Sequence, residues 1–122
     1  MAQGWANHLG HDRVLARSAG IEAHGKNPRA IAVMREVGVD ISHQESTKLT
    51  PETLNWADLV VTVCGHADEH CPVLPSHVSK RHWPLSDPAK AAGTEEDILD
   101  EFRAIRDDIM VRVRGLINDY GI

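Results

Sequence analysis

The stretch that decides the fold is DLVVTVCGHADEHC, residues 58–71. Its apolar, β-branched run from Leu59 to Val63 predicts a buried strand, because such residues pack well on a pleated surface. Gly65 ends the run, and a polar segment leads on to Cys71. Since the ends of strands in an open α/β sheet are where ligands and chemistry sit, we expect Cys64 at a place suited to a reactive group.

The chain has two cysteines, and both fall in this stretch. One interpretation is a buried structural thiol and an incidental surface thiol, since free Cys often behaves as a small hydrophobe. The arrangement favours a redox pair, in which one thiol attacks a partner and the other resolves the mixed disulfide. A permanent disulfide is not expected, because the loop is short and no signal peptide is seen.

Zinc binding is an alternative for the same stretch. Cys64, His66, His70 and Cys71 supply enough nitrogen and sulfur for a tetrahedral zinc site. Their spacing departs from the common zinc patterns. The alternative stays open at this point, and no metal or cofactor is predicted.

Length and composition indicate one ordinary domain over residues 1–122. The net charge of -5 implies no general attraction to nucleic acids or to a membrane surface. No apolar run approaches the roughly 20 residues of a transmembrane helix. Without a visible targeting peptide, a cytoplasmic location is predicted, where reducing conditions make a thiol pair catalytic rather than structural.

Helical and strand patterns alternate along the chain, which predicts an α/β fold with a mostly parallel sheet flanked by helices. Asn27 and Thr50 are expected as helix N-caps, since each precedes a proline at the first helical position. Strands are expected at 14–18, 59–63 and 81–85, and helices at 1–9, 27–38, 50–55 and over more than 20 residues from Thr94.

Apolar spacing also predicts the buried faces of two helices. The second helix is expected to bury Ala30, Ile31, Met34 and Val37. The last helix is expected to bury one long stripe, which consists of Ile98, Phe102, Ile105, Ile109, Val113 and Leu116.

Seven segments, in one order and with one spacing, resemble the thioredoxin-coupled arsenate reductases, which share the low-molecular-weight tyrosine phosphatase fold. The resemblance runs the length of the chain. The segments are MAQGW (1–5), SAGIEAHG (18–25), NP (27–28), VGVDIS (37–42), ADLVVTVCG (57–65), HWP (82–84) and DPA (87–89).

The resemblance implies a redox relay. In that family a Cys-x5-Arg-Ser loop after the first strand holds the arsenate oxyanion, and its Cys attacks arsenic. By this match, Cys64 attacks the first Cys and releases arsenite, while Cys71 attacks Cys64 and leaves a disulfide for thioredoxin. The match also implies that Asp87 is the general acid, although an Asp-Pro pair alone indicates an ordinary turn.

The sequence departs from the family at its beginning. The family's first strand and its Cys-x5-Arg loop are not found in these residues, and Met1 matches an internal position of the family pattern. As written, the chain is not expected to reduce arsenate by the family mechanism. Because the first strand is central in that fold, its absence leaves two unpaired inner edges and predicts a strand-exchanged homo-oligomer.

A potassium site, which some family members have, is not predicted. Ser18 matches one of its positions, but Gln3 and Thr47 stand where acidic residues are needed.

Three functional hypotheses follow from the sequence. The first is an arsenate reductase family enzyme that lacks its first nucleophile here. The second is a non-catalytic dithiol protein that exchanges with thioredoxin or binds arsenite or a metal ion through Cys64 and Cys71. The third, a tyrosine phosphatase relative, is weaker because a phosphatase needs no second and third Cys.

Overall fold

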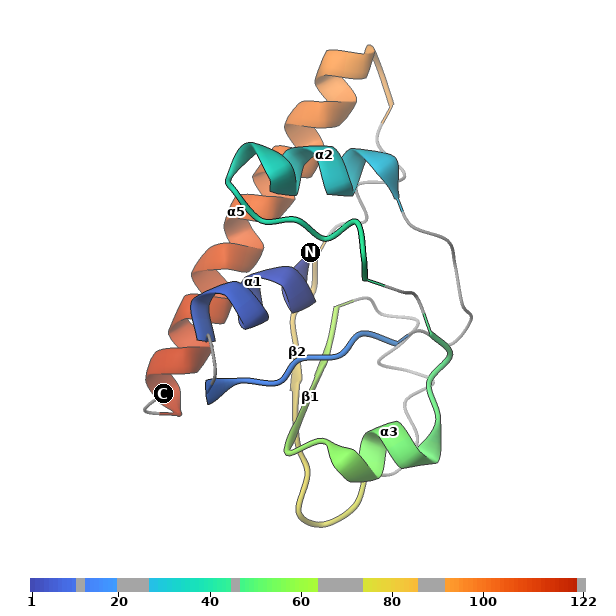
Figure 1. Cartoon of the computed structure of the whole chain (residues 1–122), viewed down its shortest axis with the longest axis vertical. Helices are drawn as coiled ribbons and strands as arrows, with labels where there is room; N and C mark the ends of the chain where they lie inside the picture. The colour runs from blue at the N-terminus through green and yellow to red at the C-terminus, as the bar shows by residue number, and fades with distance from the viewer. Residues whose placement is uncertain (11–12, 20–26, 45–46, 64–73, 86–91, 121–122) are drawn as a thin grey trace. The chain divides into compact units, whose positions relative to one another are not determined.

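The computed structural model describes residues 1–10, 13–19, 27–44, 47–63, 74–85 and 92–120. Two compact units divide its elements. The helical unit contains α1 (Ala2–Gly10), α2 (Pro28–Glu36) and α5 (Glu95–Asp119) (Figure 1). The strand unit contains α3 (Pro51–Trp56), β1 (Leu59–Thr62) and β2 (Ser79–His82). The expectation of a single domain stays a prediction.

The helical unit is built around α5, which packs against both α1 and α2 (Figure 1). Its core centres on Phe102 of α5 and on Val33 and Met34 of α2, whose side chains are fully buried. Trp5 from α1 and Ile109 from α5 are also buried. The predicted helices at the beginning and end of the chain are therefore confirmed.

The two ends of α2 are fixed by the residues that the sequence indicates. The side chain of Asn27 caps the helix, since its Oδ1 accepts hydrogen bonds from the backbone N–H groups of Arg29 at 3.0 Å and Ala30 at 3.3 Å. At the other end Gly38 has φ +81°, and the N–H of Val39 donates to the Met34 carbonyl at 3.0 Å. This is the glycine-terminated cap that ends many helices.

The buried face of α2 agrees with the predicted one only in part, since Met34 is buried but Ala30 and Ile31 are only half-buried. Val37 is 38% exposed, while Val33 is fully buried. The reason is that Val37 is the C-cap, with φ -105° and ψ 15°, so the chain has already left the helical path there. Helical periodicity cannot be extended onto a capping residue.

The long helix α5 begins with a reciprocal cap. Thr94 Oγ1 accepts from the Asp97 N–H at 3.1 Å, and Asp97 Oδ2 accepts from the Thr94 N–H at 3.2 Å. Of its predicted apolar stripe, Phe102, Ile109 and Val113 are buried. The other three members are only half-buried, namely Ile98, Ile105 and Leu116.

Residues 14–18 do not form the predicted strand. The described part of the chain offers no segment that pairs with them. The backbone N–H of Ala16 donates instead to the side chain of Asn7 in α1, at 3.1 Å. A strand needs a neighbouring strand for its backbone groups, and here a side chain takes one of them. Leu15 is correspondingly 81% exposed.

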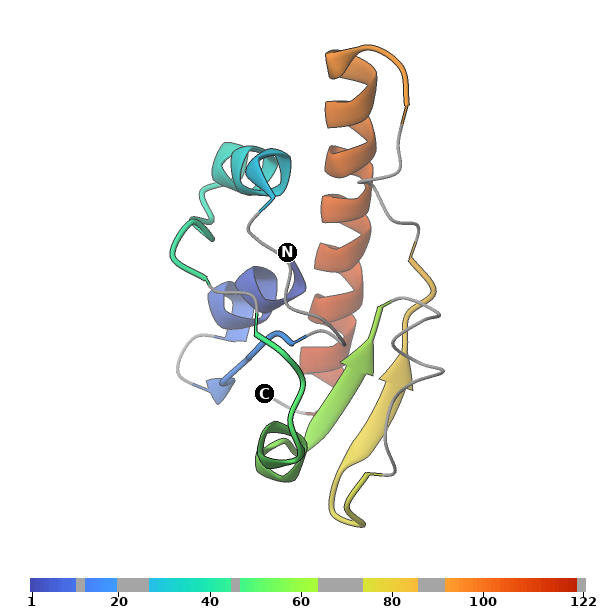
Figure 2. The ribbon, with the colours of Figure 1, turned by 90° about the vertical axis from the view of Figure 1, so that its right-hand side faces the viewer.

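The strand unit holds a parallel pair of strands, shown side by side in Figure 2. In their register Leu59 lies opposite Ser79 and Thr62 opposite His82. The predicted strand at 59–63 and the parallel sense are confirmed. The second strand begins two residues earlier than predicted and ends three residues earlier, at His82. Pro84 follows closely, and proline has no N–H with which to extend the pairing.

The strand β1 is preceded by the short helix α3, which has the predicted cap. Thr50 Oγ1 accepts from the Thr53 N–H at 3.3 Å, and Leu54 is the buried residue of this helix. Among the described helices, none is long and apolar enough to cross a membrane.

Candidate functional site

The three predicted site residues, Cys64, Cys71 and Asp87, lie outside the described residues. The same holds for His66 and His70, so the zinc alternative is not tested. The structure does show the two strands from which these segments leave. The ends of these two strands are therefore the part of the predicted site that the structure describes.

Parallel pairing brings the exits of β1 and β2 to one edge, which we call the carboxyl edge and define as Thr62, Val63, His82 and Trp83. Cys64 follows Thr62 by two residues.

The general acid implied by the resemblance is Asp87, which follows His82 by five residues. In the sequence, Cys64 and Asp87 therefore come soon after two strands that are neighbours in the parallel pair. Their use in one site stays a prediction.

One side-chain contact joins the two strand ends. Thr62 Oγ1 lies 2.7 Å from His82 Nδ1, and the N–H of Trp83 donates to the Thr62 carbonyl at 2.8 Å. Thr62 is 7% exposed and Trp83 is 8% exposed, whereas His82 is exposed. Sequence reasoning assigned no role to His82, because only the pairing register shows that it faces Thr62.

Two of the residues compared with the family's potassium site, Gln3 and Ser18, contact each other in the helical unit. The Ser18 hydroxyl donates to Gln3 Oε1 at 2.6 Å. An amide oxygen carries no net negative charge, so this pair attracts a cation less than a carboxylate would. Searching only the described residues reveals no group of three or more His, Cys, Asp or Glu side chains that could hold a metal ion.

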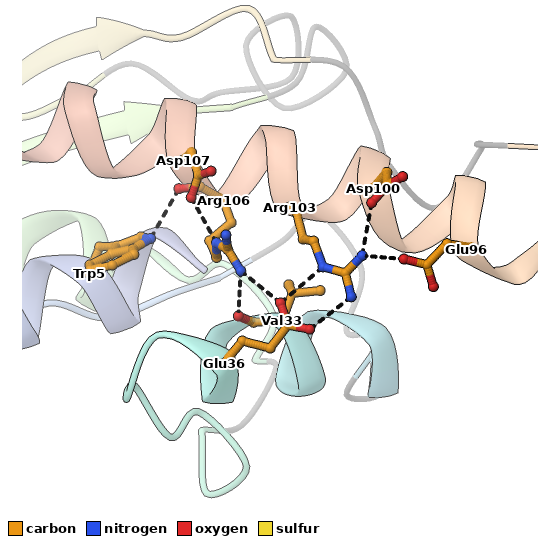
Figure 3. A network of polar contacts seen from close by, with 8 residues as sticks. All are labelled: Trp5, Val33, Glu36, Glu96, Asp100, Arg103, Arg106 and Asp107. Carbon is orange, nitrogen blue, oxygen red and sulfur yellow. Dashed lines mark hydrogen bonds and ion pairs between the residues drawn. The ribbon is translucent and has the colours of Figure 1, made fainter.

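A network of charged side chains joins α2 to α5 (Figure 3). Glu36 accepts two hydrogen bonds from Arg103, at 3.0 Å and 2.9 Å, and one from Arg106 at 3.0 Å. Arg106 is 9% exposed and also donates to the Val33 carbonyl at 2.9 Å. Trp5 Nε1 donates to the Arg106 carbonyl at 3.1 Å, which adds α1 to the network.

These contacts shift proton affinities in the expected directions. The hydrogen bonds that Arg103 donates lower the pKa of Glu36, and the acceptor carboxylates of Glu36, Glu96 and Asp100 raise the pKa of Arg103. Every group in this network has an opposite charge or a carbonyl as partner. Its arrangement therefore accounts for helix packing and gives no sign of acid–base chemistry.

Sequence comparison places the chain among known proteins. The model of the family "Low molecular weight phosphotyrosine protein phosphatase" matches residues 1–120. An arsenate reductase from Bacillus licheniformis is 52% identical over 115 residues, which cover 93% of this chain and 82% of that protein. An arsenate reductase from Bacillus subtilis is 50% identical over 114 residues, with the same shares covered.

Solved structures agree with the sequence comparison. An arsenate reductase in its oxidized state superposes with a TM-score of 0.76 and 32% identity, over 97% of this chain and 86% of that one. A thioredoxin-dependent arsenate reductase from Corynebacterium glutamicum gives a TM-score of 0.68 and 26% identity, over 97% of this chain and 53% of that one. The predicted low-molecular-weight phosphatase-like α/β fold is thus confirmed, while the lack of its first strand stays a prediction. The chain belongs to the low-molecular-weight phosphotyrosine phosphatase family and, within it, to the arsenate reductases.

Proposed function

We propose that this chain carries the second and third thiols, Cys64 and Cys71, of an arsenate-reducing relay that thioredoxin regenerates. The observation that carries the proposal is the position of a dithiol stretch directly after a parallel strand, in a chain about half identical to arsenate reductases. Thioredoxin is the proposed reductant because a structural relative is a thioredoxin-dependent enzyme.

The relay transfers two electrons from thiols to arsenate, and thioredoxin then restores the thiols. A first thiolate attacks arsenic, and Asp87 protonates the oxygen that leaves as water. The Cys64 thiolate then attacks the first sulfur, a disulfide forms, and arsenite leaves with the electron pair. The Cys71 thiolate attacks the Cys64 sulfur and expels the first thiolate. The dithiol of thioredoxin finally reduces the Cys64–Cys71 disulfide and is itself oxidised.

The first thiol of this relay is not among the 122 residues, because they contain no Cys-x5-Arg segment. This observation favours a second candidate function for the chain as given. It would act as a non-catalytic dithiol protein that exchanges with thioredoxin or holds arsenite or a metal ion. Cys64 and Cys71 are the ligands or exchanging thiols in either case.

Arsenate turnover separates the two candidates. We would follow NADPH oxidation with arsenate, thioredoxin and thioredoxin reductase, using this chain and one extended upstream of Met1 by a strand and a Cys-x5-Arg-Ser loop. The extended chain should turn over, and Cys64→Ser or Cys71→Ser within it should abolish turnover. The short chain should form a thioredoxin-reducible disulfide but show no turnover.

Two outcomes would decide against the relay. Turnover by the short chain would show that the first thiol is not needed. No turnover by the extended chain, with its thioredoxin-reducible disulfide intact, would leave the non-catalytic dithiol function.

We also propose that the chain as given associates by strand exchange. Within the described residues, β1 pairs with β2 on one side only. An unpaired strand edge presents free backbone groups to another chain. Light scattering during size-exclusion chromatography should show a homo-oligomer that the upstream extension converts to a monomer; a monomeric short chain would contradict this.

A further inference from the structure

Residues 13–18, which we call the α1-bound segment, run back along α1 within the helical unit (Figure 1). Contacts with α1 occur at every second residue of the segment, which is the alternation of an extended chain. The three contacts join Val14 to Gly10, Ala16 to Asn7 and Ser18 to Gln3. The segment is thus held in a strand-like shape by a helix, although it is not a strand of a sheet.

The residues between these contacts form the exposed side of the segment. Leu15 is 81% exposed, and Arg13 and Arg17 on either side of it are exposed as well. An exposed leucine is common by itself on a protein surface. Here it lies at the centre of an extended segment, and no described segment pairs with this one. The α1-bound segment therefore resembles the edge of a sheet, to which another chain can add as a strand.

The charges on the exposed side indicate which chain would fit. Arg13 forms no ion pair with any residue that the structure describes, whereas Arg29 and Arg103 of the same unit both bind carboxylates. A second copy of the segment would place arginine opposite arginine in parallel or antiparallel order, and like charges directly opposite each other are destabilising. A strand with acidic residues two positions before and after an apolar one would instead be complementary to this side.

We propose that the α1-bound segment is a docking edge for an extended acidic peptide, which adds as a strand and places its apolar side chain on Leu15. Because the segment is already held extended, less conformational freedom is lost on docking. The net charge of -5 disfavours a nucleic acid or an anionic membrane as the occupant. The inference goes beyond the proposed function, because it uses neither cysteine.

NMR titration of the ¹⁵N-labelled full chain with the peptide Thr-Glu-Thr-Val-Thr-Glu-Thr tests the proposal. The two Glu and the Val of this peptide lie on one side of a strand. The backbone amides of residues 14–18 and the side-chain amide of Asn7 should shift until they saturate. The matched peptide Thr-Lys-Thr-Val-Thr-Lys-Thr should bind at least about tenfold more weakly, because the attractive pairs become repulsive.

Two variants separate the apolar contact from the charge. Leu15→Asp should weaken binding of the acidic peptide by about tenfold or more, since an apolar contact is lost and a like charge is introduced. Arg13→Glu should weaken it by about two- to fivefold and should strengthen binding of the lysine peptide by a similar factor. The control is Val111→Asp, at a residue of α5 that is 63% exposed, which should leave both affinities unchanged.

The proposal is overturned if the acidic peptide shifts no amide of residues 14–18, if the lysine peptide binds as tightly, or if Val111→Asp weakens binding as much as Leu15→Asp. Shifts of the same amides when the protein alone is concentrated would assign the edge to a second copy, which also overturns it. Arsenate turnover has no part in this experiment, so a failure of the proposed function leaves its result unchanged.

Discussion

The contacts inside the helical unit differ in kind from those inside the strand unit. The helical unit has fully buried side chains at Phe102, Met34 and Val33 and a charged network above them. In the described part of the strand unit no side chain is fully buried, and the strands are joined by backbone hydrogen bonds and by contacts such as that between Thr62 and His82. The residues of the proposed chemistry thus belong to the unit with fewer fully buried side chains among the described residues. The comparison indicates that tight packing and the proposed reactivity fall in different parts of the chain.

The largest expected effect is the loss of a core side chain from the helical unit. Phe102 is 1% exposed, so Phe102→Ala should cost about 3–5 kcal/mol of unfolding free energy through the cavity it leaves. Leu54→Ala in the strand unit should cost less, about 2–3 kcal/mol, because a smaller side chain is removed. Urea unfolding measures both losses of free energy. A larger loss for Leu54→Ala than for Phe102→Ala would contradict the view that the helical unit has the more important core.

A pair of glycines tests how closely the helical unit is packed. A Cβ atom at Gly4 would lie 2.6 Å from Ile41 Cγ2 and 3.3 Å from Val39 Cγ1. Gly4→Ala should therefore destabilise the protein by about 1–2 kcal/mol, despite the gain in helix propensity.

Gly115 in α5 is the matched control, since a Cβ atom there would meet nothing within 4 Å. Gly115→Ala should stabilise the protein by about 0.5–1 kcal/mol. Thermal unfolding midpoints should move in opposite directions for the two variants. Equal shifts would mean that helix propensity, and not packing, decides both.

The smallest expected effect concerns the pH dependence of the charged network. Arg103 lowers the pKa of Glu36 in the folded state. As the pH falls, the Glu36 carboxylate of the unfolded chain is therefore protonated at a higher pH than that of the folded chain. The stability from this group is complete above its ordinary pKa of 4.5 and is lost as the pH falls through the lower folded value. Glu36→Gln should flatten that part of a urea-midpoint profile between pH 7 and about pH 3. An unchanged profile would show that other carboxylates account for the acid sensitivity.

Local sequence signals predicted the parts of the fold that short segments determine. The caps Asn27, Thr50 and Thr94 and the strand at 59–63 needed no knowledge of the rest of the chain. The strand predicted at 14–18 was wrong because a strand depends on a partner strand, which its own sequence pattern cannot reveal. Arg106 was missed for the same reason, since its burial depends on Glu36 and a carbonyl from another helix.

The site could be predicted only as far as cysteine spacing and family resemblance allow. Cys64, Cys71 and Asp87 stay predictions, while their supporting strands are confirmed. The Thr62–His82 contact was not predictable, because these residues are twenty positions apart and only the strand register brings them together.

The parallel pairing of β1 and β2 also sets a minimum length for the segment that joins them. A chain that leaves the end of one strand must travel back along four strand residues, about 13 Å, before it can enter the next strand in the same direction. Both cysteines fall in this crossover, so a deletion between the two strands would bear on the strand pair as well as on the spacing of the thiols.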